Sequence, residues 1–224
     1  MLISVPDGWK FYFELFSPRR NLIGGDAILG DLRPDPSRLQ RMTDQLDLIY
    51  ERVVVVRSQA GDEAAFAELV ARYDARLAYF LRKLVKDRAD DVLQDVWLDV
   101  FRHLPRLADP QAFRAWVYRI ARDRAFGLLR KSHLAPEPLG ETDVPDESEG
   151  DNGFDAEDAA RIHAALDLLP PEQREVLVLR FIESMSYEAI ARVTGQPLGT
   201  VRSRIHYAKR ALRTILENQL HPGV

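Results

Sequence analysis

The 224-residue sequence contains no cysteine. This absence excludes disulfide bonds, a thiolate nucleophile and any cysteine-based metal site, and it fits a reducing compartment. The five histidines are scattered, no two of them at a spacing typical of metal ligands, and the chain has no glycine-rich phosphate loop or nucleophile motif. We therefore expect a protein that is not an enzyme and that has no catalytic residues, cofactor or metal ion.

Long apolar runs are also absent. No segment approaches the roughly 20 apolar residues that a membrane-spanning helix needs. The N-terminus lacks the form of a signal peptide, because Asp7, Lys10 and Glu14 interrupt its apolar residues. Alternating strand patterns and internal repeats are missing too. These features predict a cytoplasmic, all-α protein without membrane insertion.

Charge is distributed unevenly along the chain, although the formal net charge is only −4. Residues 136–158 contain ten Asp and Glu and no Lys or Arg, so the rest of the chain is mildly basic. Proline and glycine recur in the same stretch, and apolar residues are few. This composition predicts an acidic, flexible linker over residues 133–155.

Helical periodicity on either side of this linker predicts two small helical domains, at residues 42–132 and 156–219. The expected helices of the first domain cover about 47–59, 62–84, 89–104 and 109–131. Asp62 and Asp109 are suitable N-caps, and Pro105 stops a helix. In the second domain, apolar periodicity resumes near residue 156, and the Pro170-Pro171 pair starts another helix.

Residues 1–41 are different, because four prolines and the Gly24-Gly25 pair break any sustained periodicity. We expect a disordered extension there. An alternative hypothesis is that Met42, which immediately precedes the first convincing helical pattern, is the biological start of the protein.

The last part of the chain has the pattern of a helix-turn-helix. A helix over 186–193 is followed by Gly195, which suits a left-handed turn, by Pro197, and by a second, basic helix. From Ala189 to Leu216 there is no acidic residue, whereas six Arg and Lys occur there. Such a unit is built to lay a helix in a DNA groove, and the basic residues suit phosphates. A pair of packed helices with a solvated basic face is the alternative.

Two further segments each allow two interpretations. The predicted helix 112–131 interleaves arginines with aromatic residues, so it is either an amphipathic core helix or a surface that captures single-stranded DNA. Since Trp116 and Tyr118 are two positions apart, we expect at least one of them to be exposed. Asp91, Gln94 and Asp95 share one face of the preceding helix, either as ordinary polar surface or as a docking patch for a basic partner.

Taken together, the motifs resemble those of the extracytoplasmic-function group of bacterial RNA polymerase sigma factors. The resemblance covers about residues 47–132 and 156–217 and rests on five motifs in order, namely GDEAAF (61–66), DVLQDVW (91–97), FRAWVYRIAR (113–122), LPPEQREV (169–176) and GTVRSR (199–204). Five motifs with the right separations are highly specific. The resemblance implies a factor that joins core RNA polymerase, recognises double-stranded promoter DNA and holds the melted non-template strand. An anti-sigma factor would be a further partner.

The resemblance also implies roles for individual residues. Asp91, Gln94 and Asp95 match the patch that docks on a coiled coil of the largest catalytic subunit of the polymerase. The residues that match the minus-10 segment are Arg114, Trp116, Tyr118, Arg119, Arg122 and Asp123. Those that match the recognition helix for the minus-35 element are Thr200, Arg202, Ser203, Arg204, His206 and Lys209.

Two positions depart from the family pattern. Asp123 stands where the family often has Asn, and Gly127 where it commonly has Asp. The first change brings a negative charge close to DNA, so the minus-10 preference does not follow from relatives. One rival interpretation of the whole chain is a stand-alone helix-turn-helix regulator that never binds polymerase, for which the second domain would suffice. A second rival is a purely protein-binding adaptor derived from the same fold.

Overall fold

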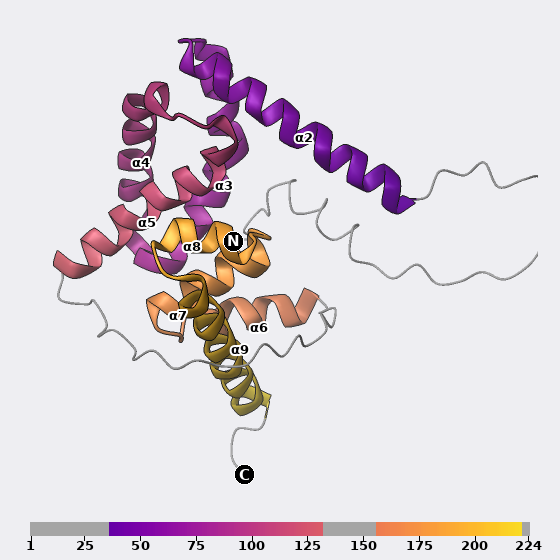
Figure 1. The fold of residues 1–224 in the computed structure, drawn as a ribbon. Helices are drawn as coiled ribbons and strands as arrows, with labels where there is room; N and C mark the ends of the chain where they lie inside the picture. Colours follow the sequence, from indigo (N-terminus) through magenta and orange to yellow (C-terminus); the bar gives the residue numbers. More distant parts are fainter. Residues whose placement is uncertain (1–35, 132–155, 221–224) are drawn as a thin grey trace, which may run out of the picture.

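The computed structural model describes residues 36–131 and 156–220, and every regular element in these ranges is a helix (Figure 1). The all-α prediction is therefore confirmed for this part of the chain. The expected linker, 133–155, and residues 1–35 of the expected extension lie outside the described residues.

The first domain follows the predicted order of helices. It consists of α2 (Pro36–Gln59), α3 (Glu63–Val85), α4 (Ala89–His103) and α5 (Phe113–Lys131), with short 3-10 turns at η1 (Lys86–Arg88), η2 (Leu104–Arg106) and η3 (Pro110–Ala112). Both expected N-caps are in place. The Asp62 carboxylate accepts a hydrogen bond from the Ala65 amide at 3.0 Å, and the Asp109 carboxylate accepts one from the Gln111 amide at 2.9 Å. These bonds satisfy amides that have no partner within the helix.

Helix α2 corrects one predicted boundary. It begins at Pro36 rather than near Asp47, so six residues of the expected disordered extension are helical. The prediction relied on apolar periodicity, which a helix does not require. Proline is tolerated in the first turn, and no further proline or glycine occurs before Gly61 to stop the helix.

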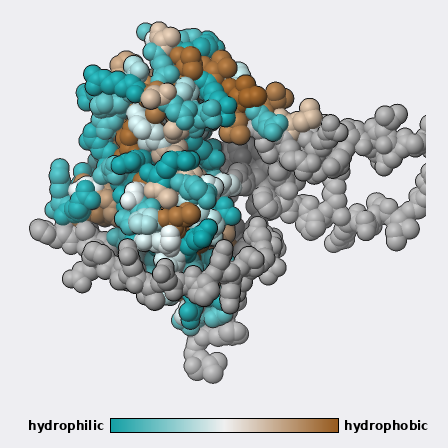
Figure 2. Space-filling view, in the orientation of Figure 1, coloured by the Kyte–Doolittle hydropathy of each residue, from teal (hydrophilic) through white to brown (hydrophobic). Residues whose placement is uncertain are grey.

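Part of α2 presents apolar side chains to solvent. Figure 2 shows this apolar surface along the helix where it projects from the body. The exposed residues are Met42, Leu46, Leu48, Ile49, Tyr50, Val53 and Val56. Among the α2 side chains that the structure describes, the apolar residues Val54 and Val55 anchor this helix in the buried core.

The second domain contains the predicted helix-turn-helix. Its elements are α6 (Ala156–Leu166), α7 (Pro171–Leu177), the π-helical segment η4 (Val178–Ile182), α8 (Tyr187–Thr194) and α9 (Leu198–Leu220). Gly195 ends α8 with φ of +67°, the left-handed conformation that glycine adopts without strain. The helix expected after Pro170-Pro171 continues into η4 as a wider π turn rather than as a regular α-helix.

The two domains pack against each other. Helix α7 lies against α3, and α8 lies against α5, as Figure 1 shows. The buried apolar residues of both domains form one connected cluster. The sequence predicted two domains joined by a tether, and nothing in it indicated that they would share an interface.

Candidate functional site

The acidic patch of Asp91, Gln94 and Asp95 lies exposed on α4. Its two carboxylates have side-chain exposures of 74% and 57%, and their ion pairs are loose, at 3.3 Å from Arg88 to Asp91 and 3.7 Å from Arg124 to Asp95. The buried residues of α4 occupy the opposite side of the helix. All three patch residues are therefore available to a partner.

The exposed face of α4 continues beyond the patch with apolar residues that the sequence analysis did not single out. Leu98 and Phe101 follow at helical spacing and are 51% and 65% exposed. The ring of Phe101 packs edge-on against the ring of Phe66, with 5.4 Å between the ring centroids. The face therefore combines an acidic end with an apolar end.

The two aromatic candidates of α5 have different environments. Tyr118 is fully buried, packed edge-on against Phe80 at 5.4 Å, and burial raises its pKa well above the usual value. Tyr118 thus cannot stack on a base in this arrangement, which corrects its place among the predicted DNA contacts. Trp116 is half-buried, so the expectation that one of the pair reaches the surface holds for Trp116 alone.

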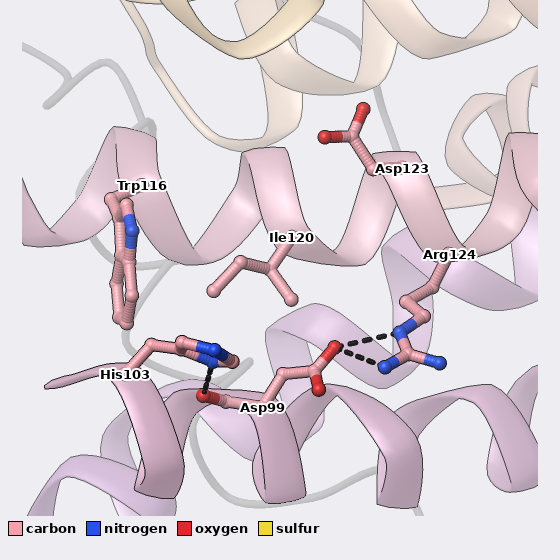
Figure 3. A pocket seen from close by; sticks show the side chains of 6 residues that line it. All are labelled: Asp99, His103, Trp116, Ile120, Asp123 and Arg124. Carbon is pink, nitrogen blue, oxygen red and sulfur yellow. Dashed lines mark hydrogen bonds and ion pairs between the residues drawn. The ribbon is translucent and has the colours of Figure 1, made fainter.

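Trp116 borders an open groove between α4 and α5 (Figure 3). Figure 3 shows Trp116, Ile120, Asp123 and Arg124 of α5 above the α4 residues that complete the groove, Asp99 and His103. Arg124 is held across it, since its Nε donates to Asp99 Oδ2 at 2.7 Å. The His103 imidazole is also held in place, because its Nδ1 donates to the Asp99 carbonyl oxygen at 2.8 Å. Trp116 thus stands at one end of a groove with fixed polar walls.

The arginines of α5 fall into an exposed and an engaged group. Arg119 is exposed, 3.9 Å from the equally exposed Asp123. Arg122 is largely covered, and its Nε lies 2.7 Å from Oε1 of Glu175 in the second domain. Arg114 donates to the Glu183 carbonyl oxygen and lies 3.6 Å from the Glu183 carboxylate. Two of the predicted minus-10 residues, Arg114 and Arg122, therefore contact acidic residues of the other domain.

The carboxylates that engage these arginines are buried. Glu175 is fully buried, and burial raises its pKa to about 7, although Arg122 acts in the opposite direction. Glu183 is also buried and has a second partner, Arg76 of α3, whose Nη2 lies 2.5 Å from Oε2. Sequence reasoning missed these residues, and no local pattern marks them, because their partners lie in a different domain.

The helix-turn-helix has the local geometry that its sequence predicts. The Ser186 hydroxyl caps α8 by accepting a hydrogen bond from the Ala189 amide at 3.2 Å. On α9, Arg202 is exposed, whereas the other predicted minus-35 residues are half-buried, namely Thr200, Ser203, Arg204, His206 and Lys209. Val201 and Ile205, which lie among these residues in the sequence, are buried in the core. One side of α9 therefore anchors the helix and the other carries its basic residues.

The described residues contain no group of three or more metal-ligating side chains, and no helix among them is long and apolar enough to cross a membrane.

Comparisons with known proteins match both domains of the chain. A family model described as sigma-70 region 2 matches residues 69–133, and one described as sigma-70, region 4, matches residues 159–212. The chain is 33% identical to RNA polymerase sigma-H factor of Pseudomonas aeruginosa over 181 residues, which cover 75% of this chain and 94% of that protein. It is 29% identical to the ECF RNA polymerase sigma-E factor of Escherichia coli over 195 residues, covering 81% of this chain and 98% of that protein.

Two solved structures share the fold. CnrH, in complex with the cytosolic domain of CnrY, matches with a TM-score of 0.56 and 28% identity, covering 75% of this chain and 97% of CnrH. The sigma factor RpoE of Bartonella quintana, in complex with the anti-sigma factor NepR, matches with a TM-score of 0.53 and 23% identity, covering 68% and 96%. Both α4–α5 and the helix-turn-helix thus lie in segments that the family models match.

Proposed function

This chain belongs to the extracytoplasmic-function group of the sigma-70 family, and from that membership we propose that it docks on core RNA polymerase, recognises minus-10 and minus-35 promoter elements and helps to open the DNA. It is a sigma factor, and its relatives are transcription initiation factors rather than enzymes. We assign it no bond-making chemistry, and we place its action in the cytoplasm, where the polymerase works.

The exposed face of α4 supports the docking role most directly. Its acidic end, Asp91 to Asp95, suits a basic partner and would orient it on approach, while Leu98 and Phe101 offer apolar area that solvent now covers. A stand-alone helix-turn-helix regulator needs no such face. By analogy with the family, the proposed partner of this face is a coiled coil of the largest polymerase subunit.

Helix α5 supports the minus-10 role. Arg119 offers an exposed positive charge for phosphate, and Trp116 offers a ring at the edge of the groove for an unpaired base. Arg114 and Arg122 would join them once released from the second domain. Asp123 accepts hydrogen bonds and donates none, so we propose that it favours a base with an exocyclic amino group, as in adenine, cytosine and guanine, over thymine, which has none.

Helix α9 supports the minus-35 role, because Arg202 is exposed near its N-terminal end while Val201 and Ile205 hold its other side in the core. Arginine in this part of a recognition helix reads a guanine edge with two hydrogen bonds. Lys209 and Arg210, two turns further on, suit phosphates, which position the helix without specifying sequence.

An anti-sigma factor is a further proposed partner. CnrH was solved with the cytosolic domain of CnrY, and a second protein of this fold was solved with an anti-sigma factor. The fold therefore accommodates partners that cover its surfaces.

Run-off transcription with purified bacterial core polymerase and a library of genomic fragments tests the proposal. We expect transcripts that depend on the added chain and that begin downstream of shared promoter elements. If the chain fails to comigrate with core polymerase in gel filtration but still binds double-stranded DNA, the stand-alone regulator is the better assignment.

A further inference from the structure

Helix α2 carries an apolar stripe that no other part of the described chain covers. Every side chain that the structure describes between Met42 and Tyr50 is exposed, and Figure 2 shows the apolar surface where the helix leaves the body. The stripe consists of five residues that are each 49–63% exposed, namely Met42, Leu46, Ile49, Val53 and Val56. Apolar residues that line up in this way, rather than lie scattered, mark an interaction surface.

The spacing of the stripe is that of a coiled coil. Its members follow one another at intervals of four, three, four and three residues. This alternation keeps the side chains in line along a helix that supercoils around a second helix, whereas packing on a globular core requires no such strict pattern. The stripe therefore predicts a helical partner.

The stripe also faces away from its own domain. Successive residues of an α-helix are about 100° apart around its axis, which places the group Val54, Val55 and Ser58 roughly opposite the stripe. All three are buried, since this side of α2 packs against α3. Tyr50 belongs to the domain as well, because its hydroxyl donates to Glu68 at 3.1 Å. A second helix can therefore reach the stripe without disturbing the packing of the domain.

We propose that the stripe is the interface of a homodimer, in which α2 of one chain pairs antiparallel with α2 of a second copy. A twofold axis brings the same surface of both chains together, so one stripe supplies both halves of the interface. The register places Leu46 opposite Ile49 of the second copy and Met42 opposite Val53 of the second copy. By symmetry, each of these layers occurs twice.

Charge favours the antiparallel orientation. In a parallel pair, Arg52 of each chain would flank the interface beside Arg57 of the other chain, five residues further along. Like charges that meet across an interface oppose association. The antiparallel register places Arg52 beside Gln45 instead, so the two arginines are kept apart. It also puts the two domains at opposite ends of the helix pair, because each domain packs on the C-terminal part of its own α2.

The contact area suits a weak dimer. In this register the two copies of α2 overlap along all of their 24 residues, which is about 36 Å at about 1.5 Å per residue. A strip of that length on a helix about 10–12 Å wide covers roughly 400 Å² per chain in projection, or roughly 800 Å² for the pair. Stable specific interfaces bury about 1,200–2,000 Å² in total. We therefore expect a reversible dimer that forms at micromolar concentrations.

Sedimentation velocity of the full chain, between about 1 µM and about 200 µM, tests the dimer. We expect a shift from monomer to dimer within this range. Ile49→Gln removes an apolar side chain from the middle of the stripe in both copies, so it should weaken association by about tenfold or more. Ile49 is exposed in the single chain, so the substitution leaves the fold of the domain intact.

Leu48→Gln is the matched control. Leu48 and Ile49 are neighbours with nearly equal exposures of 53% and 54%. The Leu48 side chain, however, lies about 100° around the helix from Ile49 and outside the stripe. The control should therefore dimerise like the wild type.

The absence of native cysteine allows the orientation to be tested by crosslinking. Gln45 and Arg52 are both exposed, and the proposed register brings Gln45 of one chain beside Arg52 of the other. A short bis-maleimide reagent should therefore crosslink a mixture of Gln45→Cys and Arg52→Cys chains. Either variant alone should give little product. Efficient crosslinking of each variant to itself, without the mixed product, would overturn the antiparallel arrangement.

Two results would refute the dimer itself. A chain that stays monomeric throughout the concentration range leaves the stripe to another segment of the same chain or to a different protein. Equal weakening by Ile49→Gln and Leu48→Gln would place the contact elsewhere. These measurements involve neither polymerase nor DNA, so their outcome is independent of the proposed function.

Discussion

Lys83 donates to both carboxylate oxygens of Asp167 at 2.9 Å, although 84 residues separate the two in sequence. The same ammonium group donates to the His163 carbonyl oxygen at 2.9 Å. Because Lys83 belongs to α3 and its partners follow the linker, this single side chain ties the two domains together. It lies on α3 beyond Arg76, whose contact with Glu183 is another link from that helix to the second domain.

Replacing Lys83 with Met should weaken the domain interface. Loss of hydrogen bonds to a charged partner costs about 1–3 kcal/mol, and Asp167 is exposed enough to be rehydrated, so we expect the lower part of that range. Urea unfolding followed by circular dichroism measures the change. Arg72→Met is the control, since exposed helix pairs contribute only about 0.3–0.5 kcal/mol. Equal effects of the two substitutions would contradict a special role for Lys83.

Reversing the charge of the α4 patch should impair docking on core polymerase. Asp91→Lys places a cation where the proposed partner is basic, and we expect an affinity loss of about tenfold, mainly through slower association. Glu217→Lys is the control, because Glu217 is an exposed acid on α9, outside the patch. Surface plasmon resonance with immobilised core polymerase distinguishes them. The docking face is misassigned if both variants behave alike.

On α9, Arg202 and Arg210 should affect promoter binding differently. Arg202→Ala should cost about 1–3 kcal/mol and relax preference at one base pair, whereas Arg210→Ala should weaken all sequences evenly and lower the salt slope by about one. Binding of the holoenzyme to a randomised minus-35 library checks both effects. Unchanged base preference in Arg202→Ala would move base recognition to another residue.

Trp116 and Tyr118 should differ in their effects on DNA opening. Trp116→Ala removes the accessible ring, and the loss of one stacked base costs about 1–3 kcal/mol. Tyr118→Phe removes only a buried hydroxyl group and should leave opening unchanged. Permanganate reactivity of thymines in the holoenzyme–promoter complex measures opening. Strong impairment by Tyr118→Phe alone would show that the buried hydroxyl group, rather than the accessible ring, matters.

Stability should depend on pH through Glu175, whose pKa is raised from 4.5 to about 7 by burial. Between these two values the folded state holds a proton that the unfolded state has lost, so stability falls as pH rises from about 4.5 to about 7. The full shift corresponds to about 3 kcal/mol. Arg122 and Arg204, which face Glu175 from α5 and α9, lower its pKa, and Glu172 raises it.

Urea unfolding of wild type and Glu175→Gln at several pH values isolates this contribution, because the variant lacks the titrating group. The pKa of His163 is lowered by burial and by Lys83, so the folded state favours its neutral form. This residue therefore makes stability rise with pH below about pH 6.5, opposite to the effect of Glu175. Parallel pH profiles for the two proteins would exclude Glu175 as a titrating group.

Helix positions were largely predictable because their signals are local. Asp62, Asp109 and Gly195 perform the capping roles that their positions predict, since each acts on amides or carbonyls within a few residues. The start of α2 was predicted wrongly because no such local signal marks it. No proline or glycine that could end the helix lies between Pro36 and Gly61. A periodic pattern of apolar residues does not predict where an exposed helix begins.

The sequence by itself determined the all-α class, the helix-turn-helix and the exposed acidic stripe of α4, because these follow from spacing along one helix or across one turn. Only the tertiary structure decided that Tyr118 is buried and Trp116 accessible, since this depends on which neighbours cover each side of α5. It alone also paired Arg76 with Glu183, 107 residues away. Charge and burial determine such contacts only after the chain has folded, and no sequence spacing encodes them.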